Sequence, residues 1–155
     1  MAGEVRDGEF LSVVKVYVDS NIFLNVWFEE MLRLSPAFYY SRRILDAILE
    51  CKFLLVISDL TLKELSRRTN LSREVIVEQY LRPYEMVEKL TVIETTKDMI
   101  REASSISRRH RLHASDALHA LVAKNEDCVL VTRDEELRTT ARRIGVRAAL
   151  PEDLI

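Results

Sequence analysis

Short apolar runs alternate with longer segments of helical period along this chain, and this alternation restricts its possible folds more than any other feature. The first two runs, Val13–Val18 and Phe53–Ile57, are almost entirely apolar, as in strands that helices cover on both faces. Repeated strand–helix units build a parallel sheet. We therefore predict an α/β fold, a three-layer α/β/α sandwich around a central parallel sheet of about five strands. The predicted strands are 13–18, 53–57, 90–93, 128–132 and 146–149.

Segments of helical period fill the space between these strands. Ser72 is a predicted N-cap, Thr95 with Asp98 is a predicted capping box, and Asn70 and Gly145 are typical helix ends. Two helices stand between the first two strands, which predicts a projecting helical hairpin. The predicted helices are about 21–33, 37–50, 59–69, 73–89, 97–110, 115–125 and 134–143.

Length and composition favour one domain over residues 13–155, preceded by a charged N-terminal extension over residues 1–12. The two cysteines form no CxxC pair and are typical of core positions in a reducing compartment. No apolar run approaches the ~18 residues of a membrane span, and no signal peptide is visible. We expect a cytoplasmic protein without a membrane partner. The net charge of −2 argues only against coating duplex DNA by bulk charge.

Four acids, widely separated in sequence, stand where an α/β sheet would bring them together. Asp19 directly follows the first predicted strand, and Asp134 closely follows the fourth. Glu64 lies on the helix that follows the second strand, and Asp116 opens an apolar helix. Ligands of open parallel sheets bind beyond the carboxyl ends of the strands. Four clustered carboxylates repel one another, by ~4 kcal/mol per pair near a protein surface, so the pattern predicts a divalent cation.

Each acid also has a structural interpretation. Asp19 and Asp134 can cap the helices that follow them, and Asp116 suits the first turn of its helix. Glu64 can close a capping box or pair with Arg68. Asp116 is the hardest to explain in this way, because its helix is almost wholly apolar and offers no cation three or four residues on.

The histidines do not form a recognisable zinc pattern. His110, His113 and His119 lack an accompanying CxxC or HExxH motif. They are more typical of surface positions near an arginine-rich helix end. His119 can alternatively orient or neighbour Asp116 without ligating the metal itself.

The arginine clusters are typical of solvated faces and can alternatively contact phosphates near the acids. Arg133 is the strongest candidate for binding substrate, because it stands between Thr132 and Asp134 at the expected mouth of the site. The clusters are Arg67-Arg68, Arg108-Arg109-His110-Arg111 and Arg142-Arg143.

Four segments of the chain resemble, in order, the acidic motifs of PIN-domain ribonucleases. The resemblance extends over roughly residues 13–150, and the chain length resembles that of VapBC-type toxins and their stand-alone prokaryotic relatives. The segments are Val18-Asp19-Ser20-Asn21-Ile22-Phe23, Ser58 to Glu64, Ser115-Asp116-Ala117-Leu118-His119-Ala120, and Leu130-Val131-Thr132-Arg133-Asp134.

This resemblance implies an endoribonuclease that uses one or two Mg²⁺ or Mn²⁺ ions. Asp19, Asp116 and Asp134 would ligate metal directly, and Glu64 would ligate it or hold a coordinated water. The supporting residues would be Asn21 and Thr132, through hydrogen bonds, and Glu136, as an outer ligand. The resemblance also implies RNA as the substrate, a homodimer, and a cognate antitoxin that covers or fills the acidic pocket.

Two other classes of protein compete with this interpretation. A non-catalytic PIN-like scaffold could bind RNA or protein, although it would have no reason to keep acids in an apolar setting. A phospho-acceptor domain would also use Mg²⁺ on an α/β fold. Such domains usually carry adjacent acids near the first strand, and Asp19-Ser20-Asn21 offers only one.

Overall fold

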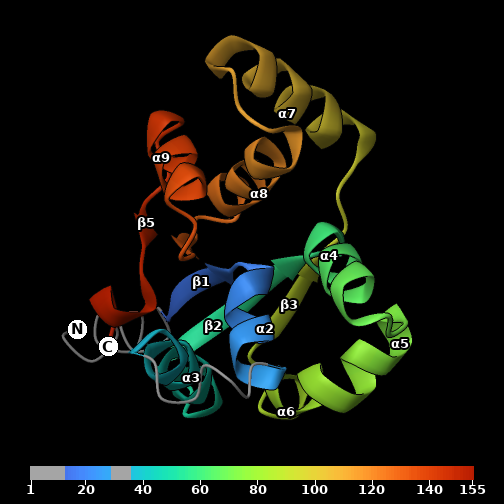
Figure 1. Ribbon diagram of the computed structural model, residues 1–155, viewed down its shortest axis with the longest axis vertical. Coiled ribbons are helices and arrows are strands. Elements are labelled where there is room, and N and C mark those ends of the chain that lie inside the picture. The colour runs from blue at the N-terminus through green and yellow to red at the C-terminus, as the bar shows by residue number, and fades with distance from the viewer. Residues whose placement is uncertain (1–12, 29–35) are drawn as a thin grey trace, which may run out of the picture.

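The structure is a computed structural model that describes residues 13–28 and 36–155 (Figure 1). Its centre is a five-stranded sheet in the order β3-β2-β1-β4-β5, and every neighbouring pair is parallel. All five predicted strands are present, and β4 and β5 are shorter than predicted. The strands are β1 (Val14–Val18), β2 (Phe53–Ser58), β3 (Leu90–Ile93), β4 (Val129–Val131) and β5 (Ala148–Ala149).

The helices follow the predicted segments closely, with one difference. The predicted helix 73–89 ends at Met86 and contains a π-helical turn, Val77–Leu81, directly before Arg82-Pro83. Proline has no backbone N–H to continue the α-helical hydrogen bonds, which accounts for the break. The helices are α2 (Ser20–Trp27), α3 (Pro36–Leu49), α4 (Asp59–Thr69), α5 (Arg73–Ile76), α6 (Arg82–Met86), α7 (Lys97–His110), α8 (Ala114–Asn125) and α9 (Glu135–Arg143), with a final 3₁₀ turn at Pro151–Asp153.

Alternating side chains of the strands point into two separate cores, so the fold has three layers. Val16 and Val18 pack with apolar residues of α2 to α6 on one face of the sheet. Tyr17 points to the opposite face, where it packs in a core that includes Ala120 of α8 and Leu137 of α9. Helix α7 covers α8 from outside (Figure 1). The predicted α/β/α sandwich is confirmed.

The order of the strands creates a switch point between β1 and β4. The chain adds β2 and β3 on one side of β1, and then adds β4 and β5 on the other side. Helices leaving β1 and β4 therefore diverge beyond the carboxyl ends of these two strands, where such sheets bind their ligands. Residues 19 and 132–134 lie at this position, since Val18 pairs with Val131 in the sheet.

Two details of helix capping differ from the prediction. Thr96, not Thr95, caps α7 by accepting a hydrogen bond from the backbone N of Met99 at 3.2 Å. Thr95 instead donates to Asp59 Oδ1 at 2.9 Å. The capping box at the start of α4 joins Thr61 to Ser58, so Glu64 is free for other contacts.

The predicted helix ends at Asn70 and Gly145 are confirmed as left-handed positions, with φ of 60° and 86°. The predicted N-terminal extension, residues 1–12, and the end of the predicted helix 21–33 lie outside the described residues. Within the described ranges, no helix combines the length and apolar composition needed to cross a membrane.

Candidate metal centre

The four predicted acids line one pocket of about 210 Å³ beyond the carboxyl ends of β1 and β4. They come from four elements of the fold, as the sequence predicted. The pocket also contains one histidine and two arginines of the predicted clusters. Its lining residues are Asp19, Ser20, Asn21, Glu64, Arg67, Arg68, Asp116, His119, Asp134 and Leu137.

Asp19 occupies the N-cap position of α2, but its side chain makes no capping hydrogen bond. Its carboxylate turns into the pocket, where Thr132 Oγ1 donates to Oδ2 at 2.8 Å. The residue is only 5% exposed, and burial raises the pKa of its carboxyl against the lowering influence of His119 and Thr132. The capping interpretation of Asp19 is therefore wrong, and a buried carboxylate remains to be explained.

Asp134 does cap its helix. Its Oδ1 accepts hydrogen bonds from the backbone N atoms of Glu136, at 3.0 Å, and of Leu137, at 3.3 Å. The backbone N of Asp134 in turn donates to Thr132 Oγ1 at 3.0 Å. One threonine hydroxyl thus joins Asp19 to the segment that carries Asp134. Capping uses a single carboxylate oxygen, so the structural role of Asp134 is compatible with a second role in the pocket.

Asp116 lies in the first turn of α8, and its carboxylate makes no hydrogen bond or salt bridge to any residue that the structure describes. Burial raises the pKa of this carboxyl, and the negative charge of Asp134 raises it further. An acid in this position is more costly to ionise than one in water. A structural explanation for Asp116 is therefore missing, as the sequence suggested.

Glu64 is held by a buried histidine. His119 Nε2 lies 2.9 Å from Glu64 Oε1, and His119 Nδ1 lies 2.6 Å from the hydroxyl of Tyr17. Burial alone would raise the pKa of Glu64, but the hydrogen bond and charge of His119, with Ser20 and Arg67, outweigh it and lower this pKa. Burial would lower the pKa of His119, but the hydrogen bond and the negative charge of Glu64 outweigh it and raise this pKa.

Tyr17 is anchored in its turn by the start of α4. Its hydroxyl lies 2.7 Å from Ser58 Oγ and 3.2 Å from Thr61 Oγ1, so it links the capping box of α4 to His119. Both ring nitrogens of His119 are therefore engaged, one by a tyrosine and the other by a glutamate. This arrangement suits an imidazole that orients a carboxylate better than one that binds a ligand itself.

Sequence reasoning missed Tyr17, and it connected His119 only with Asp116. Surface positions were the favoured interpretation of the histidines, whereas His119 is only 2% exposed. One signal pointed to it, since His119 lies three residues after Asp116 on an apolar helix. Nothing in the local sequence connects it to Glu64 or to Tyr17, because both partners are distant along the chain.

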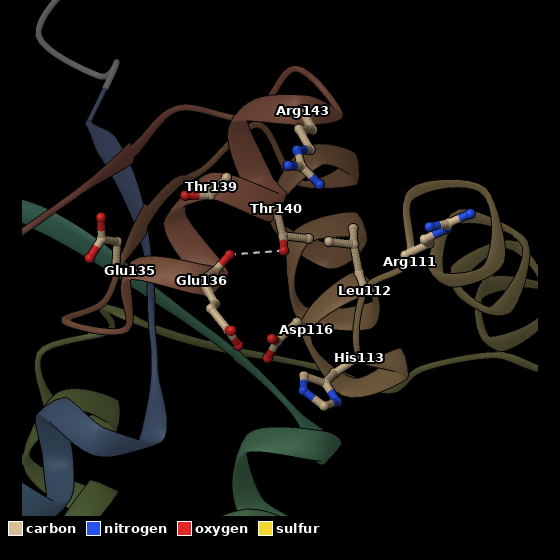
Figure 2. Close-up of a pocket in the computed structure, with 9 residues that line it drawn as sticks. All are labelled: Arg111, Leu112, His113, Asp116, Glu135, Glu136, Thr139, Thr140 and Arg143. Carbon is tan, nitrogen blue, oxygen red and sulfur yellow. Dashed lines mark hydrogen bonds between the residues drawn. The ribbon is translucent and has the colours of Figure 1, made fainter.

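The supporting residues have different positions. Thr132 makes a hydrogen bond to Asp19, and Asn21 lines the pocket. Glu136 is exposed and lies beside Asp116 in an adjoining pocket (Figure 2). Arg133 does not line the acidic pocket; its guanidinium donates to Glu152 at 2.9 Å and to the backbone O of Ala37 at 3.3 Å. These contacts assign Arg133 to the fold, where it ties the C-terminal turn to α3.

The donor set fits a divalent cation. Among the described residues, the ligand atoms that lie within 4.8 Å of one another belong to Asp19, Glu64 and His119, and not to Asp116 or Asp134. Because both nitrogens of His119 are engaged, Asp19 and Glu64 are the members of this group that can offer an oxygen to a cation. His119 and Ser20 both contact Oε1 of Glu64, and no described residue hydrogen-bonds to Oε2. Two of the acids have raised pKa values that follow first from burial, so a bound cation would relieve a cost that the protein alone leaves in place.

Solved structures share this fold. FitAcB from Neisseria gonorrhoeae matches with a TM-score of 0.59 and 21% identity, over 88% of this chain and 98% of that chain. PAE2754 from Pyrobaculum aerophilum matches with a TM-score of 0.54 and 23% identity, over 91% and 92%. VapBC2 from Rickettsia felis, bound to a DNA fragment from its promoter, matches with a TM-score of 0.55 and 17% identity, over 88% and 98%.

The sequence comparisons give one match. Comparison with curated proteins finds no significant relative. A family model described as the PIN domain matches residues 16–143, a range that includes all four acids. This range is well over half of the chain, and the protein therefore belongs to the PIN domain family.

Proposed function

We propose that this protein is a metal-dependent endoribonuclease that hydrolyses phosphodiester bonds of RNA. One observation carries the proposal: four carboxylates from four separate elements line a single pocket at the switch point of the sheet. Membership of the PIN domain family supports the same chemistry. Carboxylate oxygens are the ligands that Mg²⁺ and Mn²⁺ prefer, which makes either ion the expected cofactor.

Each acid has a distinct part in this proposal. Asp19, Asp116 and Asp134 would hold the metal, and Glu64 would ligate it or hold a coordinated water. A bound ion held by these residues would lower the pKa of a coordinated water and stabilise the leaving oxygen of the phosphodiester. Thr132 keeps the Asp19 carboxylate turned into the pocket through its 2.8 Å hydrogen bond.

His119 does the same for Glu64. Its Nε2 holds Oε1 and leaves Oε2 to the pocket, and Tyr17 prevents the ring from turning. We therefore regard His119 and Tyr17 as positioning residues. Arg67 and Arg68, which lie on the pocket wall, replace Arg133 as the residues expected to orient the RNA backbone at the acids.

We further propose that the protein is the toxin of a toxin–antitoxin pair or an RNA-processing relative of such toxins. Similar solved structures include a toxin–antitoxin complex from Klebsiella pneumoniae and VapBC2 from Rickettsia felis. A cognate antitoxin would cover or fill the acidic pocket. A homodimer and a cytoplasmic location, both expected from the sequence, belong to this proposal.

Cleavage of a fluorogenic single-stranded RNA tests the proposal. Protein stripped with EDTA is expected to be inactive and to recover activity with Mg²⁺ or Mn²⁺. Ca²⁺ is expected to support cleavage poorly, because its larger radius and looser coordination would misplace the attacking water. An Asp19→Asn preparation, purified in the same way, controls for contaminating nuclease. Activity equal to the wild type in this variant would leave the non-catalytic scaffold as the better explanation.

A further inference from the structure

A second pocket, of about 520 Å³, adjoins the acidic pocket between α8, α9 and the connection that follows α7 (Figure 2). Asp116 lines both pockets and therefore joins them. Figure 2 shows the carboxylates of Asp116 and Glu136 near each other at one end, with Arg143 at the opposite end. Arg111 also lines this pocket, from the C-terminal end of α7.

These two arginines come from different sequence clusters, and the fold brings them to the same pocket. Arg111 belongs to the cluster at the end of α7, and Arg143 to the cluster at the end of α9. Neither forms a salt bridge with any residue in the described part of the chain, whereas Arg133 and Arg101 are paired with acids. Both side chains are exposed, and Arg143 Nη1 donates to the backbone O of His110 at 3.5 Å.

The two ends of the pocket differ in charge. The end at Asp116 is acidic and continues into the metal centre, while Arg143 places positive charge at the other end. A ligand that suits this arrangement has one anionic group for the metal centre and a second anionic group further along. Consecutive phosphates of a nucleic acid strand have this pattern.

The volume and shape of the pocket select the form of the nucleic acid. About 520 Å³ lies within the ~300–1,000 Å³ range of pockets that enclose small ligands, which is sufficient for one nucleotide. A base within a duplex cannot enter such a recess without leaving its stack, and unstacking costs a few kcal/mol. A single strand avoids this cost, and unpaired RNA bases are readily splayed out.

We infer that this pocket holds the nucleotide next to the scissile phosphate of a single-stranded RNA, with the following phosphate against Arg143 and Arg111. The inference rests on the proposed function, since the scissile phosphate is the one held at the acids. It also separates the arginines by role: those that line the acidic pocket or the adjoining pocket contact the strand, and their neighbours Arg142 and Arg109 are solvated.

Binding of a fluorescent single-stranded RNA of about eight nucleotides, a length within known site sizes for single strands, tests the inference by anisotropy in Ca²⁺. A phosphate contact to a single strand contributes a slope of ~0.7 to the salt dependence, or about fivefold in affinity between 1 M and 0.1 M salt. Arg143→Ala and Arg111→Ala are each expected to reduce the slope by ~0.7 and the RNA affinity at 0.1 M salt by about fivefold. Arg142→Ala is the matched control, because both arginines are exposed and each donates to one backbone O, Arg142 to that of Ala148 and Arg143 to that of His110. It should bind like the wild type.

A neutral methylphosphonate, placed at one linkage of the RNA at a time, identifies the phosphate. Neutralising the linkage one nucleotide from the cleaved position should weaken binding to the wild type about fivefold. The same change should have no further effect on Arg143→Ala, because the contact is already lost. At linkages far from Arg143, the loss of affinity from the methylphosphonate and the loss from Arg143→Ala should add.

The outcomes separate this inference from the proposed function. Equal losses for Arg143→Ala and Arg142→Ala, or additive effects at every linkage, would overturn the subsite even if the protein cleaves RNA. A protein in which Arg143→Ala removes the effect of neutralising one particular linkage, but which never cleaves RNA with Mg²⁺ or Mn²⁺, would keep the phosphate contact at Arg143 and contradict the proposed catalysis.

Discussion

Tyr17→Phe removes one oxygen atom from the centre of the network that holds Glu64. The tyrosine is fully buried, and its hydroxyl contacts His119 Nδ1 at 2.6 Å and Ser58 Oγ at 2.7 Å. Phenylalanine fills the same space, so the packing of the ring is preserved. Ser58 keeps its contacts with Thr61, whereas His119 Nδ1 is left buried without a partner.

The expected cost follows from that single unsatisfied group. Leaving one buried polar group without its partner costs about 1–3 kcal/mol. For a domain of this size, a loss of about 2 kcal/mol lowers the melting temperature by about 4–8 °C. Release of His119 also frees Glu64, and loss of such an orienting partner typically weakens metal binding about 10- to 100-fold.

Thermal unfolding of the metal-free protein and a Mn²⁺ titration measure these two effects. Tyr84→Phe is a matched control, because Tyr84 is 5% exposed and its hydroxyl makes no hydrogen bond to a residue that the structure describes. Burial raises the pKa of Tyr84 to about 12, and this control should change neither stability nor Mn²⁺ affinity appreciably. Equal behaviour of the two variants would refute the role assigned to the Tyr17–His119–Glu64 network.

Three further predictions concern the acids and Arg133. Burial raises the pKa of Asp116, so ionisation of this carboxyl destabilises the metal-free protein as the pH rises above about 4. Asp116→Asn should therefore keep or raise the melting temperature at pH 7, while abolishing metal-dependent cleavage. A strong loss of stability would favour a structural role for Asp116. Asp134→Asn should retain the helix cap and Asp134→Ala should lose ~1 kcal/mol in denaturant unfolding, although both variants lose metal-dependent activity. Arg133 is paired with Glu152, so Arg133→Ala should lower the free energy of unfolding by up to ~1 kcal/mol and leave the RNA affinity unchanged. Weaker RNA binding without a loss of stability would instead show that Arg133 binds the substrate.

The sequence predicts the parts of this site that follow from strand ends. Asp19 and Asp134 come after buried strands, and parallel strands place their carboxyl ends at one edge. Asp116 was identifiable because an unpaired acid on an apolar helix has few structural explanations. These arguments depend only on local patterns and on the direction of the chain, so they hold before the packing of the helices is known.

Contacts between distant side chains were not predictable in the same way. Tyr17 and His119 are 102 residues apart, and only the packing of α8 on the sheet brings them together. Arg133 was expected at the mouth of the site because it stands between Thr132 and Asp134, yet the C-terminal turn supplies Glu152 as its partner. Of two side chains that are adjacent in sequence, one can thus line the site while the other only stabilises the fold.

The central claim is that the four acids hold the ion that is needed for RNA cleavage. The most direct test titrates Mn²⁺ into EDTA-stripped protein and follows bound Mn²⁺ by electron paramagnetic resonance and RNA cleavage in the same sample. We expect both signals to reach half-saturation at one Mn²⁺ concentration, and Asp19→Asn to lose both. Full cleavage in EDTA, or cleavage that saturates where the wild type has bound no Mn²⁺, would contradict the account.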